Sequence, residues 1–155
     1  MSTIATDSSL SEPHASALAS LVAMMIPASA KYGIPGADDE TIMADIRSTA
    51  RQHAELLQAG LTELVAQAEQ SHGAPFAELE AATRRELIEA TRLEAPLFYR
   101  VLISITVQCY YRDPRVMESL GMEARPPFPE GFDVPQGDWS MLDPVRDRGP
   151  IWRDA

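Results

Sequence analysis

The sequence predicts an all-α fold: a small bundle of about four to five helices over residues 1–121, followed by an extended arm over residues 122–155. Hydrophobic residues make up 45% of the 155-residue chain, which is enough for a buried core in one domain. Apolar residues recur at intervals of three and four through most of the first 121 residues, the spacing of one helix face. That spacing stops after Gly121, and residues 122–155 hold half of the 12 prolines and both tryptophans.

The first predicted helix begins at Ser11, a residue type that caps helix N-termini, and has Pro13 in its first turn. Pro27 ends this helix. The next segment, 29–37, is rich in turn-forming residues, and Pro35-Gly36 predicts a type II turn in which the glycine has a positive φ. The apolar residues that give the first helix its spacing are Leu18, Leu21, Val22, Met25 and Ile26.

A second helical segment is predicted from Asp38-Asp39 to about Gln70, because acidic side chains favour a helix N-terminus. It is either one long helix or two helices in line, with Gly60 marking the bend. His53 lies on its apolar stripe, which predicts a packed histidine, and the turn-forming segment 72–75 ends the helix. The stripe consists of Ile42, Ile46, Ala50, His53, Leu57, Leu61, Leu64 and Ala68.

A third helix is predicted to begin between Glu80 and Thr83, and Thr83 with Glu86 has the spacing of a capping box. Pro96 opens a fourth helix that runs to about Tyr111. This fourth helix is apolar on most sides, which predicts that it is the central one. Its apolar residues are Leu97, Phe98, Val101, Leu102, Ile105 and Cys109.

The helical part ends with a short helix from Asp113-Pro114 to Leu120-Gly121, where glycine is the C-terminal cap. In the arm that follows, prolines interrupt any regular helix or strand. A disordered tail is poor in aromatic residues, so the arm is expected to pack on the helical body, on a partner, or on both. Its large apolar residues are Phe128, Phe132, Trp139, Leu142, Ile151 and Trp152.

Charge and hydropathy exclude several classes of partner. The formal net charge is −10, which repels nucleic acid and anionic membrane surfaces. No apolar run approaches the roughly 20 residues of a membrane-spanning helix. Residues 1–10 contain no basic, apolar or twin-arginine export signal, so we expect a cytoplasmic rather than a periplasmic location.

Few residues have a pattern that indicates catalysis. Glu69 and His72 have the Glu-x-x-His spacing of di-iron bundles, but such a site needs the motif twice and two further carboxylates. Cys109 is the only cysteine, and its apolar neighbours predict a buried, inert thiol. We see no nucleophile beside a base and no glycine-rich loop for a dinucleotide. The sequence therefore predicts a chain without a catalytic residue, a metal or a cofactor of its own.

Five segments together carry a resemblance to a known family. They are Met25–Ser29 (MIPAS), Ile34–Ala37 (IPGA), Phe76–Leu79 (FAEL), Tyr110–Val116 (YYRDPRV) and Trp139–Val145 (WSMLDPV). In their order and spacing the chain resembles the gluconate 2-dehydrogenase subunit 3 family, over most of its length. Members of that family are small helical subunits encoded with flavin-dependent oxidoreductases of the glucose–methanol–choline type.

The resemblance implies that a large partner subunit holds FAD and oxidises a hydroxyl group of a sugar, glycoside or other alcohol, while this chain binds and stabilises it. Two alternatives remain open: a homo-oligomeric helical protein whose tail swaps between copies, and a helical di-iron metalloprotein. The residues predicted to bind the partner are Tyr110, Tyr111, Arg115, Phe128, Phe132, Trp139, Leu142, Asp143, Pro144 and Trp152.

Overall fold

A computed structural model describes residues 10–126, 128, 130–131, 133 and 136–149. The predicted all-α class is confirmed: in these residues the only β-type pairing is an isolated bridge between Ser29 and Ile34. The chain divides into two units, the first ending at Ala124 and the second beginning at Arg125. The first unit contains α1 (Glu12–Met25), α2 (Glu40–Ala50), η1 (Arg51–His53), α3 (Ala54–His72), η2 (Phe76–Glu78), α4 (Ala81–Glu94), α5 (Pro96–Tyr110) and α6 (Pro114–Ser119).

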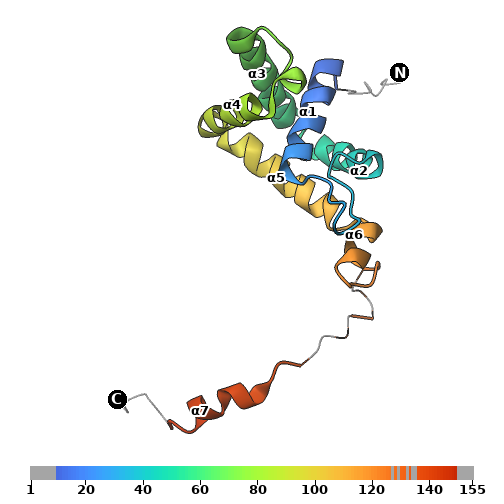
Figure 1. Ribbon diagram of the computed structural model, residues 1–155, viewed down its shortest axis with the longest axis vertical. Coiled ribbons are helices and arrows are strands. Elements are labelled where there is room, and N and C mark those ends of the chain that lie inside the picture. The colour runs from blue at the N-terminus through green and yellow to red at the C-terminus, as the bar shows by residue number, and fades with distance from the viewer. Residues whose placement is uncertain (1–9, 127, 129, 132, 134–135, 150–155) are drawn as a thin grey trace, which may run out of the picture. The chain divides into compact units, whose positions relative to one another are not determined.

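Helix α5 lies at the centre of the first unit and contacts α2, α3 and α4 (Figure 1). Helices α3 and α4 pack near its beginning, where the α3 backbone at Gly60 lies against the Phe98 ring and Thr91 bonds the Tyr99 hydroxyl. Helix α2 packs near its end, where the Thr49 hydroxyl lies 3.5 Å from Cys109 Sγ. Helix α1 covers α3 and η2. The largest fully buried side chains are Tyr110, Phe76, Phe98, Leu21, Ile42, Met43, Ile46, Leu61, Leu64, Leu102, Val22 and Val116.

The second predicted helical segment is two helices, and the break lies at 51–53 rather than at Gly60. Gly60 is inside α3, where the absence of a Cβ lets the helix pack on the Phe98 ring. The break follows from packing, because α2 packs near the end of α5, whereas α3 packs near its beginning and also contacts α1. His53 is exposed at the N-terminus of α3, so the prediction of a packed histidine was wrong.

The loop between α1 and α2 contains a glycine with positive φ, but at Gly33 (64°) and not at Gly36. Two hydrogen bonds between Ser29 and Ile34, of 3.0 and 3.2 Å, close the turn that contains Gly33. The predicted conformation of Gly36 was therefore wrong. Gly36 is needed for close approach instead, because a Cβ there would overlap Asp38 Oδ1 and lie 2.9 Å from the Ala28 nitrogen.

One further prediction needs correction. Helix α4 begins at Ala81 with Glu80 as the N-cap residue, so Thr83 lies inside the first turn and its predicted capping box does not form. The predicted central position of helix α5 is confirmed, and one face of this helix is exposed along its whole length. The burial predicted for Cys109 is confirmed, since the residue is only 2% exposed.

The second unit contains a short helical segment that the sequence pattern did not predict: η3 (Trp139–Leu142) followed by α7 (Asp143–Arg146). Asp138 is its N-cap residue, and Asp138 Oδ1 accepts hydrogen bonds from the Ser140 nitrogen (3.0 Å) and hydroxyl (2.6 Å). These bonds hold the pKa of Asp138 below its usual value. The segment has too few residues to show a period, so only the aspartate cap and Pro144 could have indicated a helix.

Candidate partner-binding surfaces

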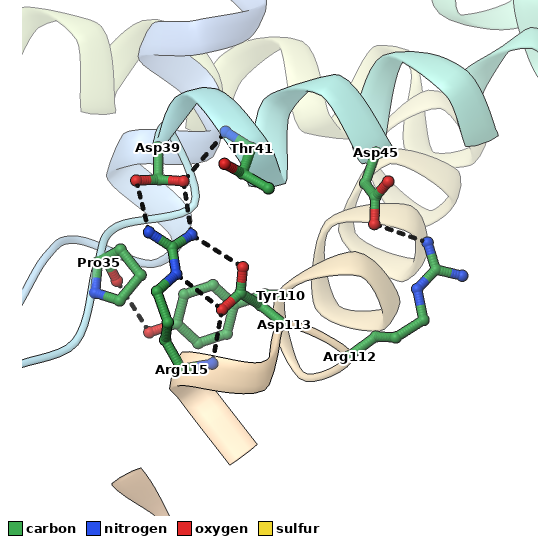
Figure 2. Close-up of polar contacts among 8 residues, drawn as sticks. All are labelled: Pro35, Asp39, Thr41, Asp45, Tyr110, Arg112, Asp113 and Arg115. Carbon is green, nitrogen blue, oxygen red and sulfur yellow. Dashed lines mark hydrogen bonds and ion pairs between the residues drawn. The ribbon is translucent and has the colours of Figure 1, made fainter. Parts of the chain in front are cut away.

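The first unit contains a cluster of polar side chains at the start of α2 and the start of α6, which we name the junction cluster: Pro35, Asp39, Tyr110, Asp113 and Arg115 (Figure 2). Asp39 caps α2 by accepting from the Thr41 nitrogen (3.1 Å). Asp113 caps α6 by accepting from the Arg115 nitrogen (2.9 Å). Both aspartates are where helix N-termini favour them, and together they place two carboxylates near one guanidinium.

Arg115 connects the two capping carboxylates. Its guanidinium donates two hydrogen bonds to Asp39, of 2.7 and 3.1 Å, and two to Asp113, of 2.8 and 3.0 Å. These bonds hold the pKa of each carboxyl below its usual value, although burial acts in the opposite direction. The same bonds raise the pKa of Arg115, which therefore stays charged. The guanidinium thus fixes the first turn of α6 on the first turn of α2.

Tyr110 completes the junction from the end of α5. Its hydroxyl donates to the Pro35 carbonyl (3.0 Å), and its ring is only 2% exposed. Burial raises the pKa of Tyr110, so the hydroxyl keeps its proton. On the neighbouring turn, Arg112 pairs with Asp45 at 3.1 Å, on the surface. The segments 34–37 and 110–116, which carry much of the family resemblance, therefore meet in space and hold the fold together.

The predicted partner-binding residues of the first unit differ in their access to a partner. Tyr110 is buried and offers no surface, and the Arg115 guanidinium is bonded to two carboxylates of its own chain. Tyr111 is exposed, with its ring edge-on to Tyr110 at a centroid distance of 5.2 Å. Sequence reasoning assigned Tyr110 and Arg115 to a partner because they lie just before the arm. Their bonds to Pro35 and Asp39 span 75 and 76 residues, so no local pattern indicated them.

Tyr111 lies at the end of an exposed strip on α5 that sequence reasoning missed, which we name the α5 face. On this face Leu97, Ile103, Val107 and Tyr111 are between 40% and 52% exposed. One signal was available in the sequence, because α5 is apolar at more positions than one buried side requires. The α5 face consists of Pro96, Leu97, Arg100, Ile103, Ser104, Val107, Gln108 and Tyr111.

The second unit leaves several large apolar side chains exposed. Phe128 is 86% and Trp139 61% exposed, and Leu142 is also exposed. The unpredicted Met141 and Val145 belong to the same group. Asp143 and Pro144 form the exposed start of α7, where Asp143 pairs with Arg146 at 3.3 Å. The predicted contacts Phe132 and Trp152 lie outside the described residues.

The residues considered for chemistry do not come together in the described part of the chain. Glu69 and His72 are both exposed at the end of α3. No group of three or more His, Cys, Asp or Glu side chains with the geometry of a metal site occurs among residues 10–126 and the described positions beyond them. Over the same residues, no helix is both long and apolar enough to cross a membrane.

Comparison with known proteins gives one finding. The family model described as gluconate 2-dehydrogenase subunit 3 matches residues 12–126. The matched stretch begins with α1 and ends just after the first unit, so it contains the junction cluster and the α5 face. Of the five segments with family resemblance, only Trp139–Val145 lies beyond the match. Neither the curated proteins nor the solved structures give a match.

Proposed function

Because the chain belongs to the gluconate 2-dehydrogenase subunit 3 family, we propose that it is a noncatalytic small subunit that binds and stabilises a large FAD-dependent oxidoreductase. The observation that carries the proposal is the family match over residues 12–126, since the family is described as one subunit of a dehydrogenase. We further propose that the large subunit is of the glucose–methanol–choline type. Its substrate would be a sugar, a glycoside or another alcohol.

The structural roles of the reactive side chains support a noncatalytic chain. Cys109 is buried in α5, and the Tyr99 hydroxyl is bonded to Thr91, with its pKa raised by burial. The carboxylates with the clearest pKa shifts in the first unit, Asp39 and Asp113, are neutralised by Arg115 and cap helices. These groups already have partners that stabilise the fold.

In the proposed complex the FAD of the large subunit accepts the hydride from the substrate alcohol, and this chain contributes binding energy alone. A partner that binds only the folded large subunit raises its stability by about 2.7 kcal/mol when it is present at 100 times the dissociation constant. Exposed apolar residues on both units support such a binding role, because groups of exposed apolar side chains mark interaction sites.

The test is affinity purification of the tagged full-length chain from its native host. We expect a larger, yellow protein to co-purify, with a flavin absorbance spectrum and dye-reducing activity toward sugars or alcohols. The chain alone should reduce no dye with these substrates, with or without added FAD. Turnover by the isolated chain would refute the noncatalytic role, and a colourless homodimer would favour the homo-oligomeric alternative. Cell fractionation tests the predicted cytoplasmic location.

A further inference from the structure

The α5 face has a distinctive charge. The chain contains 23 acidic residues, yet none lies on α5, and the only charged residue of that helix is Arg100. Arg100 is exposed and makes no hydrogen bond or ion pair in the described part of the chain. Arg92 pairs with Glu89 at 2.8 Å and Arg112 with Asp45, whereas the exposed Arg85 of α4 resembles Arg100 in making no ion pair within the described residues. The α5 face is therefore a largely apolar strip without acidic residues, and its single charge, on Arg100, is unpaired.

We infer that the α5 face is where the helical bundle docks the large subunit, through an apolar surface of that subunit with a carboxylate opposite Arg100. This inference rests on the proposed function and specifies where and how the binding occurs. A guanidinium that becomes buried in an interface needs a partner, and a carboxylate matches its geometry with two hydrogen bonds. The apolar residues on both sides of Arg100 would exclude water from that pair.

Two other polar side chains of the α5 face already have a hydrogen-bond partner within the chain. The Gln108 amide donates to the Ser104 hydroxyl at 2.9 Å, one turn away on the same helix. Each of these two side chains therefore keeps one hydrogen bond within the chain when water leaves. Arg100 is the group that still needs a bond from outside, so it would select among apolar partners.

A hollow in the surface lies at the beginning of the α5 face. It is an open depression of about 300 Å³ between α3 and the start of α5. Gly60 and the Phe98 ring that packs on it form part of the lining. Glu63 and Glu94 also line it. Leu97 borders this hollow, so an apolar side chain of the large subunit that enters it would contact the α5 face as well.

A second copy of this chain fits the face poorly. In a symmetric pair both copies present the same surface, so each brings an arginine and neither brings a carboxylate from α5. Two chains of charge −10 also repel each other. A strip about 22 Å long and about 10 Å wide, the dimensions of fifteen residues of one helix, covers about 220 Å², well below the roughly 800 Å² per partner of a standard interface. The face is therefore one part of a larger contact with a larger protein.

The test compares full-length variants in binding to the flavoprotein that the wild-type chain retains. Arg100→Glu should reduce retention at least tenfold, and Ile103→Ser, which changes no charge, should also reduce it. The matched control is Arg85→Glu, the same charge change at an exposed position of α4, which should retain the flavoprotein as the wild type does. Circular dichroism should show unchanged helix content in all three.

The outcomes separate the two proposals. If the wild-type chain retains no flavoprotein, the proposed function fails, and this inference fails with it. If the wild type retains it and both Arg100→Glu and Ile103→Ser retain it equally well, the α5 face is not the docking surface, while the proposed function stands. If Arg85→Glu loses as much flavoprotein binding as Arg100→Glu, the effect comes from the overall charge of the chain. If the wild type forms a homodimer that Arg100→Glu dissociates, the α5 face binds a second copy. Either result overturns the inference.

Discussion

Gly60→Ala gives a sharp test of the packing between α3 and α5. In an exposed helix interior this change stabilises a protein by about 1 kcal/mol, because alanine has the higher helix propensity. At Gly60, however, the new methyl group would overlap the Phe98 ring, including the ring carbon attached to the Cβ of Phe98. Phe98 is buried and lies edge-on to Tyr99 at 4.8 Å, so it has little room to move.

The two effects oppose each other, and the overlap should prevail. Overpacking of a buried site costs about 1–3 kcal/mol, and the overlap with the Phe98 ring places the cost in the upper half of that range, above the gain in propensity. We therefore expect Gly60→Ala to lower the free energy of unfolding by about 1–2 kcal/mol, and the melting temperature by roughly 3–8 °C. The assay is thermal and urea unfolding followed by circular dichroism. Ala59→Gly, at the exposed neighbouring position, measures the propensity difference without an overlap. A melting temperature of Gly60→Ala at or above that of the wild type would refute the reasoning.

Three other predictions follow from the same structure. Gly36→Val should lower the free energy of unfolding by about 1–3 kcal/mol, through overlap with neighbouring backbone rather than through φ, and an unchanged urea midpoint would contradict this. The carboxylates of the junction cluster have folded-state pKa values below their unfolded ones, so their contribution to the free energy of unfolding is complete above about pH 4 and is lost as the pH falls toward the folded values. Arg115→Met should weaken this pH dependence, which urea midpoints measured over a range of pH would detect. The same pH dependence in the wild type and in Arg115→Met would contradict a role of the cluster in stability. Truncation after Gly121 should leave the helices formed but weaken binding of the flavoprotein, and Trp139→Ala in the full chain should cost roughly 2 kcal/mol of binding free energy. If the truncated chain stays folded and retains the flavoprotein fully, the arm is not part of the interface; if the truncated chain unfolds, the arm belongs to the core of this chain.

The elements that the sequence predicted well depend on local interactions. The beginning of α1 at Ser11 and Pro13, the end of α3 at Gly73 and the start of α6 at Asp113 each rest on a residue whose conformation or hydrogen bonding acts within one turn. Gly73 has a φ of 65°, which glycine adopts without strain. Local signals of this kind need no knowledge of the tertiary structure, so a single sequence is sufficient to predict them.

The predictions that failed depend on contacts between distant segments. The break at 51–53 contains neither proline nor glycine and arises because α2 and α3 pack at different ends of α5. The predicted contact of Arg115 with a partner stays a prediction, while its bond to Asp39, which is 76 residues away, was equally beyond any local pattern. The same holds for Gly36, whose constraint is the Ala28 backbone on the other side of a turn. In each case the deciding neighbour lies beyond the range of any pattern in a single sequence.

Helix α5 shows how a confirmed prediction bears on function. Its apolar residues on most sides predicted a central helix, and within the first unit α2, α3 and α4 do pack on it, but the α5 face stays exposed. Helix α5 therefore has more apolar residues than the fold of the first unit buries. A neighbouring protein that covered the α5 face would bury that surplus and make α5 central in the complex. An exposed apolar face on a central helix is the pattern expected of a helix that is buried in an assembly, and it supports the subunit role that we propose from the family match.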